Sequence, residues 1–198
     1  MSAERLRRSD WLVDWISNHA DAARLVRAWH YSKSTPNTST YRHGLYRQPF
    51  ELGDPWGVAM WIPPTRSAAE AIAGDDWMGV LSLSRLVVAP EVPPNGASFL
   101  LGGSMRLIDR ERWPVLVTYA DRALGHTGAI YKATNWRCDG DVPAGDVWIG
   151  PNGERRGRKR GRFSYKRDEM IALGFRRADA APKVRYVHDV RPARVIDR

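Results

Sequence analysis

The chain has 198 residues, 43% of them hydrophobic, with nine Trp, seven Tyr and four Phe, which is enough apolar surface for one domain of ordinary size and excludes a disordered protein. Lys and Arg outnumber Asp and Glu by 31 to 22, and this excess of +9 favours a polyanionic partner, nucleic acid ahead of an anionic membrane. No apolar run approaches the roughly 20 residues of a membrane-spanning helix, and the N-terminus lacks the apolar segment of a secretory signal. Cys138 is the single cysteine, so an internal disulfide is excluded and we expect an intracellular protein.

The first third of the chain alternates apolar runs with capping and breaking residues. Residues 11–16 are compatible with a strand or the first turn of a helix. Ser17 and Asn18 are residue types that cap a helix, and the apolar spacing after them predicts an amphipathic helix over 18–31. Residues 56–62 are typical of a strand, and the Ala-rich segment 65–77 has room for one or two helical turns.

The centre of the chain gives the clearest pattern. A long strand ends before three prolines, a turn follows that can cap a helix, and a short apolar run is typical of a buried parallel strand. This order of elements requires a right-handed crossover and predicts an α/β (α+β) fold. The expected elements are a strand over 80–88, a turn over 95–98, a helix over 99–112, a strand over 115–119, a helix over 125–135, and strands over 136–141 and 184–190.

One stretch, residues 154–167, holds eight basic residues and a single acidic one, Glu154. A solvated loop is one interpretation, because charge runs usually need no ligand. Phosphate binding is the other, favoured by the pliant Gly157 and Gly161 and by the stacking surfaces of Phe163 and Tyr165. The residues predicted to contact DNA are Arg155, Arg156, Arg158, Lys159, Arg160 and Arg162, together with His126.

From about residue 80 to 138 the layout resembles the GNAT acyltransferases. The segment LSRLVVAPEVPPNGASFLLGGSM is similar to the family's strand, tight loop and helix, and IYKATNW is similar to its tyrosine-bearing helix. The resemblance implies one domain over 1–198, with a mixed central sheet whose central strands are splayed and flanked by helices. Residues 142–182 would be a basic insertion or arm within it. An acyl donor such as acetyl-CoA would be held by Val87, Val88, Asn95, Gly96, Ala97 and Ser98.

The donor loop departs from the GNAT pattern. Those proteins use a glycine-rich loop, because only glycine lets backbone N–H groups converge on two phosphates. Here Pro93, Pro94 and Asn95 precede a single glycine, Gly96. The helix that follows still offers free N–H groups, so the expected cofactor is acetyl-CoA or another activated small-group donor.

A narrower resemblance is to the phage Mom-type DNA-modification proteins. It rests on AWHYSKS (28–34), LSRLVV (83–88), the turn NGAS (95–98), TYADRALGHTGAIYKATNW (118–136) and KVRYV (183–187). The family resemblance implies a transferase that adds a carbamoylmethyl-type group to the exocyclic amine of adenine and protects phage DNA from restriction. Double-stranded DNA would be the partner, and the bacterial host cytoplasm the location.

The amine of adenine is a weak nucleophile, so a transferase needs a hydrogen-bond acceptor on it and a donor held in line. Asp121, just past a buried strand, is the leading candidate, although it would equally suit a helix cap. Tyr119 lies on the same side of the strand, either at the site or in sheet packing. His126 could orient Asp121 or cap a helix.

Other candidates come from the remaining motifs. Tyr131 occupies the position of the GNAT general acid, or it packs as an ordinary helical tyrosine. His30 and Tyr31 end the first helix on the acceptor side that the resemblance implies, where His30 has a possible role as a metal ligand or a helix-dipole partner. Arg85 interrupts an apolar strand, so it must reach solvent, a carboxylate such as Asp121, or an anionic donor.

Two alternatives to DNA modification remain. One is a conventional N-acetyltransferase that uses acetyl-CoA on a protein or small-molecule amine. The other is a basic nucleic-acid-binding protein that keeps the fold without catalysis.

Overall fold

The computed structural model describes residues 5–48, 54–143, 146–153, 155–160, 163–178 and 182–191. The chain forms two compact units. Unit 1 comprises Met1–Thr118, Ala129–Arg137 and Tyr186–Arg198, and unit 2 comprises Tyr119–Gly128 and Cys138–Arg185.

A mixed sheet of seven strands runs in the order β1-β2-β3-β4-β5-β12-β6. Strands β1 to β4 are antiparallel neighbours, whereas β4 and β5 are parallel. Their pairing covers only Val80–Ser82 with Val115–Val117, so the two central strands are joined at one end alone, as the expected splay requires. The bounds are β1 (Trp11–Trp15), β2 (Tyr41–Arg47), β3 (Gly57–Ile62), β4 (Val80–Val88), β5 (Val115–Asp121), β6 (Arg137–Val142) and β12 (Lys183–Asp189).

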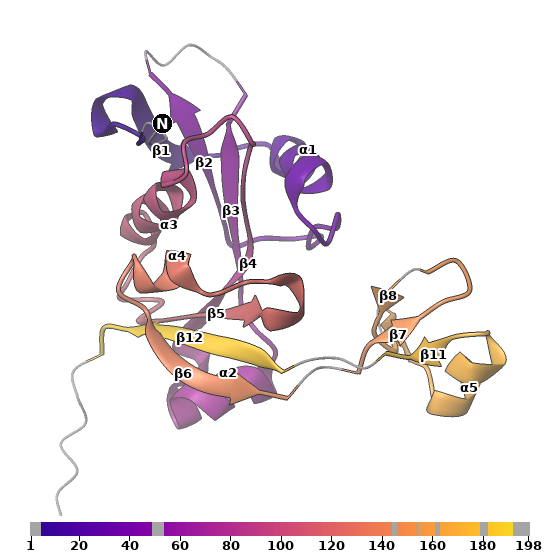
Figure 1. Ribbon diagram of the computed structural model, residues 1–198. Helices are drawn as coiled ribbons and strands as arrows, with labels where there is room; N and C mark the ends of the chain where they lie inside the picture. The colour runs from indigo at the N-terminus through magenta and orange to yellow at the C-terminus, as the bar shows by residue number, and fades with distance from the viewer. Residues whose placement is uncertain are drawn as a thin grey trace, which may run out of the picture. The chain divides into compact units, whose positions relative to one another are not determined.

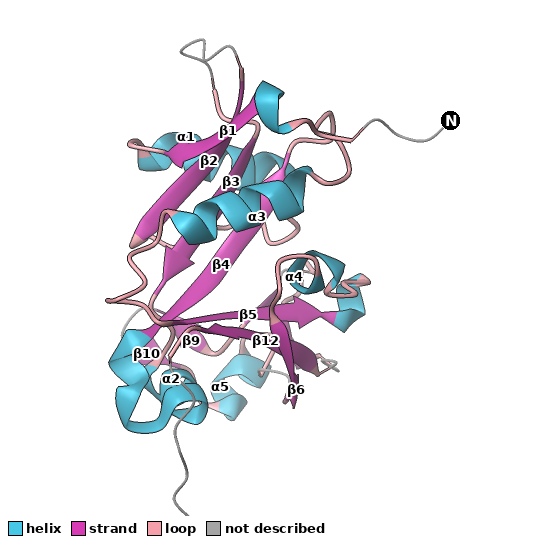
Figure 2. Cartoon of the chain, turned by 90° about the vertical axis from the view of Figure 1, so that its left-hand side faces the viewer, coloured by secondary structure: helices cyan, strands magenta, loops and turns pink. Residues whose placement is uncertain are grey.

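Two helices of unit 1, α1 (His19–Trp29) and α3 (Gly96–Arg106), lie on opposite faces of strands β1 to β4 (Figure 1). Figure 2 shows α3 running across its face of the sheet. Both helices contact β2, β3 and β4. The remaining regular helices of unit 1 are α2 (Arg66–Ala73) and the single turn α4 (Ala129–Lys132).

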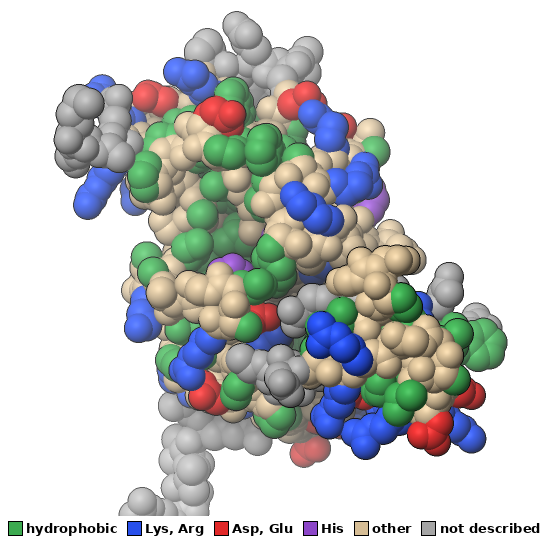
Figure 3. All heavy atoms as spheres, turned by 45° about the vertical axis from the view of Figure 1, so that its right-hand side comes forward, with side chains coloured by type: hydrophobic (Ala, Val, Ile, Leu, Met, Phe, Trp, Pro, Cys, Tyr) green, Lys and Arg blue, Asp and Glu red, His purple; other side chains and the backbone are tan. Residues whose placement is uncertain are grey.

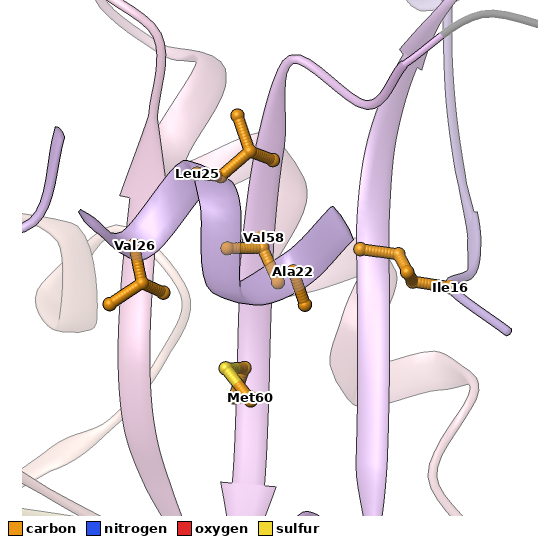
Figure 4. Close-up of a cluster of buried hydrophobic side chains, with 6 residues drawn as sticks. All are labelled: Ile16, Ala22, Leu25, Val26, Val58 and Met60. Atoms are coloured by element: carbon orange, nitrogen blue, oxygen red, sulfur yellow. The ribbon is translucent and has the colours of Figure 1, made fainter. Parts of the chain in front are cut away.

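Helix α1 forms where its cap and its apolar spacing predict it. Asn18 accepts a hydrogen bond from Ala20 N at 2.9 Å and so satisfies one of the free amides of the first turn. Ala22, Leu25 and Val26, three and four residues apart, then face β3 and are buried with Val58 (Figure 4). This cluster fixes α1 on the sheet.

Two predictions of helix bounds are wrong, and one strand was not predicted. Helix α3 begins at Gly96, three residues before the expected start, and ends at Arg106, six residues before the expected end. The helix expected over 125–135 shrinks to α4, because Gly125 and Gly128 adopt positive φ angles of 75° and 73° that helical residues cannot share. Strand β2 was not expected, since its sequence YRHGLYR lacks an apolar run.

Unit 2 contains a small fold of its own. A three-stranded sheet has the order β11-β7-β8, and a hairpin pairs β9 with β10. Trp148, Met170 and Phe175 form its buried core, against which Tyr165 packs. The predicted arm over 142–182 lies within this unit. Its elements are β7 (Trp148–Ile149), β8 (Arg155–Arg156), β9 (Lys159–Arg160), β10 (Phe163–Ser164), α5 (Arg167–Ala172) and β11 (Arg176–Arg177).

Among the described residues, none of the helices has both the length and the apolar character that crossing a membrane requires.

Candidate functional site

Arg85 stands at an irregularity in the centre of unit 1. Opposite Met60 and Trp61 of β3, the pairing of β4 jumps from Arg85 to Leu83, so Ser84 bulges out of the ladder. The half-buried Arg85 guanidinium donates to Ser34 O and to Ser84 O, each at 2.6 Å. The sequence predicted that Arg85 reaches solvent, a carboxylate or an anionic donor. In the structure it donates hydrogen bonds to backbone carbonyls of the 28–34 motif and of the bulge.

Tyr31 lies beside this guanidinium. Burial lowers the pKa of Arg85, and the nearby Tyr31 hydroxyl raises it. The Tyr31 ring is 54% exposed and lies over the ring of His30, with 4.3 Å between the centroids. His30 is buried, and its Nδ1 accepts from Ser32 N at 3.1 Å, which places the hydrogen of the neutral ring on Nε2.

Tyr131 of α4 completes the arrangement. Thr118 of β5 donates to its hydroxyl at 3.4 Å, and the ring of Tyr186 from β12 lies 5.0 Å away. Burial raises the pKa of Tyr131, the Thr118 hydrogen bond lowers it, and Tyr31 and Tyr186 raise it further. The phenol therefore keeps its proton at neutral pH. We call Tyr31, Arg85, Thr118, Tyr131 and Tyr186 the tyrosine–arginine cluster.

The cluster brings together three predicted site residues, Tyr31, Arg85 and Tyr131, with His30 stacked on Tyr31. Sequence reasoning missed two members. Thr118 is the one hydroxyl that follows three buried apolar residues in β5, and that break in the pattern is a usable signal. Tyr186 is 3% exposed and belongs to the KVRYV motif, whose alternation indicated only a strand.

A pocket of about 600 Å³ lies along α3 in unit 1, a volume suited to a small-molecule ligand. It receives positive charge from Arg8, Arg106 and Arg110, and His188 also lines it. Its other lining residues are Ser98, Phe99, Gly102, Met105, Ala133, Thr134, Asn135 and Val190.

Arg110, one of the lining residues, has a buried nitrogen. Its Nη2 donates to Pro114 O at 2.9 Å and lies 3.3 Å from His188 Nδ1, whereas its buried Nη1 has no hydrogen-bond partner among the described residues. Burial lowers the pKa of Arg110, and Asp189 raises it. Burial, with Arg110 next, lowers the pKa of His188. Arg110 therefore adds positive charge to the lining of the pocket, while its Nη1 atom is shielded from solvent.

The residues predicted to hold a donor phosphate lie at the N-terminus of α3. A Cβ on Gly96 would come within 2.1 Å of Val92 Cγ1, so the glycine makes room for a valine side chain. The Asn95 side chain accepts from Leu6 N at 2.7 Å, and Ser98 donates to Asn95 O at 2.9 Å. Ala97 is half-buried in the first turn. Of this set, Ser98 also lines the pocket along α3.

The two valines predicted at the donor site end β4. Val87 pairs with Val58 and packs against the apolar cluster under α1, and Val88 pairs with Gly57. Both side chains are half-buried. Their contacts are those of sheet packing.

Ser104 of α3, which the sequence also offers as a donor-binding residue, instead joins a buried polar group with two side chains of the sheet. The Ser104 hydroxyl accepts from Trp61 Nε1 at 2.8 Å and lies 2.7 Å from His43 Nδ1. His43 is fully buried, and its Nε2 has no hydrogen-bond partner among the described residues. Burial lowers the pKa of His43 to about 4, and Asp14 raises it. The imidazole is therefore neutral at physiological pH.

Asp121, Tyr119 and His126 belong to unit 2. Asp121 Oδ1 accepts from Ala123 N at 3.1 Å and so caps the short helix Arg122–Leu124, while its Oδ2 lies 3.7 Å from Lys183 Nζ. Burial raises the pKa of the half-buried Tyr119, and Arg185 lowers it. His126 is exposed in the loop that follows. The role of Asp121 as an acceptor for the adenine amine stays a prediction, and its capping bond is the alternative that the sequence left open.

Several basic residues of unit 2 have structural partners. Arg158 and Arg177 both bind the carboxylate of Asp146. Arg156 lies 4.1 Å from the ring centroid of Phe175, a cation–π contact at the core of the unit. Lys159 is exposed on β9. Arg162 lies outside the described residues, as do the side chains of Arg155 and Arg160.

Within the described residues, no three or more His, Cys, Asp or Glu side chains are grouped so that they could hold a metal ion.

The fold is that of known acetyltransferases. A Bacillus subtilis acetyltransferase in complex with CoA is similar with a TM-score of 0.53 and 8% sequence identity, and the match covers 92% of this chain and 99% of that chain. A Staphylococcus aureus N-acetyltransferase has a TM-score of 0.52 and 13% identity, with coverage of 92% of this chain and 99% of that chain. The Escherichia coli ribosomal-protein-S18-alanine N-acetyltransferase has a TM-score of 0.52 and 8% identity, with coverage of 92% of this chain and 96% of that chain. This likeness confirms the predicted GNAT-like architecture. No curated protein matches the chain significantly.

The sequence comparison is more specific than the fold. A family model matches residues 10–143, which contain Tyr31, Arg85, Thr118 and Tyr131 of the tyrosine–arginine cluster. Since the match spans more than half of the sequence, this chain belongs to the Mom protein family.

Proposed function

We propose that the chain is a DNA-modifying transferase that adds a small acyl-derived, carbamoylmethyl-type group to the exocyclic amine of adenine in double-stranded DNA. The modified base would protect phage DNA from restriction. Membership of the Mom family and an acyltransferase fold support a group transfer. The observation that carries the proposal is the tyrosine–arginine cluster, in which the exposed Tyr31 interacts electrostatically with the Arg85 guanidinium and with the half-buried, protonated phenol of Tyr131.

The reaction joins the N6 atom of adenine to the carbon of the transferred group. That N–C bond forms while the bond between the carbon and the leaving group of the donor breaks. N6 loses one proton, and the leaving group gains one. The protein's part is to position both reactants, to accept the first proton and to supply the second.

Tyr131 is suited to supply that proton. Its raised pKa keeps the hydroxyl protonated at neutral pH, and the Thr118 hydrogen bond fixes its direction. Arg85 holds the 28–34 segment through Ser34 O, and Tyr31 of that segment interacts electrostatically with Tyr131. Tyr31, with more than half of its side chain exposed, offers a ring on which a base could stack.

The pocket along α3 fits an anionic part of the donor. Arg8, Arg106 and Arg110 supply the positive charge with which an anion would pair. If the donor is a coenzyme A thioester, this pocket would hold a phosphate group, and attack of N6 on the thioester carbonyl would release the thiol and leave an acyl group on N6. A carbamoylmethyl product would instead require a donor that is activated at the methylene carbon which bonds to N6. Gly96, in contrast, is occupied with packing against Val92.

The DNA partner follows from charge. Exposed basic side chains of unit 2 include Lys159, Lys166, Arg167 and Arg176, and Figure 3 shows Lys and Arg side chains close together at the lower right of the face it draws. N6 is paired inside a duplex, so the target adenine must leave the base stack before it can react.

Nucleoside mass spectrometry tests the proposal. Plasmid DNA from bacteria that express the chain should contain a new deoxyadenosine derivative, and DNA from cells that express Tyr131→Phe should not. Unmodified deoxyadenosine under good expression of the folded protein would contradict the proposal, and tight binding of acetyl-CoA together with acetylation of a protein amine would favour a conventional acetyltransferase.

A further inference from the structure

Phe163 is the most exposed of the large apolar side chains among the described residues. Its side chain is 79% exposed, compared with 60% for Met78 and 58% for Ile171. Burying a phenylalanine side chain stabilises a fold, so unit 2 leaves this stabilisation unused. A single exposed apolar residue needs no explanation by itself, but the position of this one does.

Phe163 stands at the closed end of a hairpin. It pairs with Arg160 across β9 and β10, and only two residues of sequence separate the partners. Tyr165 N donates to Arg158 O at 3.0 Å, which continues the hairpin away from its closed end. The two aromatic side chains then differ: Tyr165 packs on the core of Trp148, Met170 and Phe175, and Phe163 does not. The core anchors the hairpin and leaves its tip with an unpacked ring.

The surroundings of the ring are the most basic in the sequence. Lys159 pairs with Ser164, next to Phe163, and is exposed; Lys166 and Arg167 follow on the same segment and are exposed as well. Phosphate groups would pair with these cations, while an apolar ring gains nothing from the phosphates. The interior of a base stack is the one apolar surface that a duplex offers between its two phosphate chains.

We propose that Phe163 is a wedge that enters the base stack of double-stranded DNA and helps to drive the target adenine out of it. The inference rests on the DNA-binding part of the proposed function. Proteins that deform DNA insert apolar side chains of this kind between base pairs while basic neighbours hold the backbone. The phenylalanine ring would stack on the neighbouring bases in place of the departing adenine. This stacking lowers the free energy that extrusion of the adenine requires. Phe163 is in this scheme a positioning residue and not a catalytic one.

The test uses the full chain and duplexes in which 2-aminopurine replaces one adenine, in every combination of neighbouring bases. This base fluoresces when it leaves the stack. We expect the protein to raise the fluorescence in at least one context and Phe163→Ala to lose most of that rise. Duplex affinity, measured by anisotropy, should weaken by less than about tenfold, because phosphate contacts dominate it.

Two control variants sharpen the result. Phe163→Leu keeps an apolar wedge and should retain most of the rise, and Ile171→Ala removes another exposed apolar side chain of unit 2 and should retain all of it. If Phe163→Ala keeps the full rise, or if the wild-type protein binds DNA without any rise, the wedge is refuted. If cells that express Phe163→Ala still contain modified adenine at the wild-type level, the wedge is refuted and the proposed function stands. If the wild-type protein neither binds duplex DNA nor modifies it, both the wedge and the proposed function are refuted.

Discussion

Arginine is used differently in the two units, and under the proposed function this difference separates the transfer reaction from attachment to DNA. In unit 1, Arg85 and Arg110 are half-buried in the interior of an acyltransferase-like fold, where each donates to backbone carbonyls. In unit 2, Arg156 lies over Phe175, and Arg158 binds Asp146. The net charge of a segment therefore overstates the charge that it can offer to DNA, because part of that charge holds the segment together.

The comparison also assigns the exposed side chains. Unit 1 exposes Tyr31, which interacts electrostatically with the half-buried phenol of Tyr131 and suits a reacting base. Unit 2 exposes Lys159 and Phe163, which suit a phosphate and a base stack. Each unit can be tested by a change that leaves the other intact.

The largest effect is expected from Trp148→Ala. The side chain is fully buried in a core of three residues, and its loss should cost about 3–5 kcal/mol of stability. Hydrogen exchange should then show reduced protection in unit 2 and normal protection of β3 and β4. Trp29→Ala, which removes a half-exposed tryptophan from α1, is the matched control and should leave both units protected. An equal loss of protection in both units would contradict the division.

The next effect concerns Tyr131→Phe. Removal of the hydroxyl should lower the rate of adenine modification by about 100-fold, since a positioned general acid contributes that order of magnitude. The melting temperature should change little, because only the 3.4 Å hydrogen bond from Thr118 is lost. Thr118→Val, which removes the same hydrogen bond and keeps the phenol, separates the roles: a loss as large as that of Tyr131→Phe would mean that the hydroxyl merely supports the packing.

A pH dependence of stability should come from His43. Its pKa of about 4 in the folded state lies below the ordinary 6.5, so the unfolded state binds more protons between these values. Stability is therefore lost as the pH falls below 6.5, by about 2 kcal/mol between pH 7 and pH 5. Urea unfolding at the two pH values measures this loss, and His43→Gln should remove most of it. The same loss in the variant would point to another group.

The smallest effect compares two basic residues of unit 2. Lys159→Ala should reduce the slope of log affinity for duplex DNA against log salt concentration by about 0.9, and leave stability unchanged. Arg156→Ala should instead lower the stability of unit 2 by about 1–2 kcal/mol through the loss of its contact with Phe175. If Arg156→Ala changed the salt slope and Lys159→Ala did not, the assignment of free and structural charges would be reversed.

The sequence predicted the elements whose pattern is local. The capping residue Asn18 and the apolar spacing after it predicted α1, and the apolar run before the prolines predicted β4 to its final residue. Strand β2 could not be predicted, because its stability comes from pairing with β1 and β3 and not from its own residues. The helix predicted over 125–135 is shortened because Gly125 and Gly128 adopt positive φ angles. Glycine can adopt positive or negative φ angles, so the sequence alone does not predict this turn.

The site was predicted in part for the same reason. Arg85 is conspicuous in an apolar strand, and Tyr131 was expected from a motif. The partners of these two residues are distant in sequence: Ser34 is 51 residues from Arg85, and Thr118 is 13 residues from Tyr131. Arg110 lies in a polar segment, and nothing in the sequence indicates that its guanidinium is buried. Only the structure shows that its Nη1 atom is buried and has no hydrogen-bond partner among the described residues.

The central claim is that unit 1 transfers a group to adenine while unit 2 presents the DNA. A digest of plasmid DNA from cells that express the wild-type chain, Tyr131→Phe or Lys159→Ala, analysed by nucleoside mass spectrometry, tests it most directly. We predict a modified deoxyadenosine from the wild-type chain, less of it from Lys159→Ala and almost none from Tyr131→Phe. Deoxyadenosine that is unmodified in every sample, with all three proteins folded and abundant, would contradict the account.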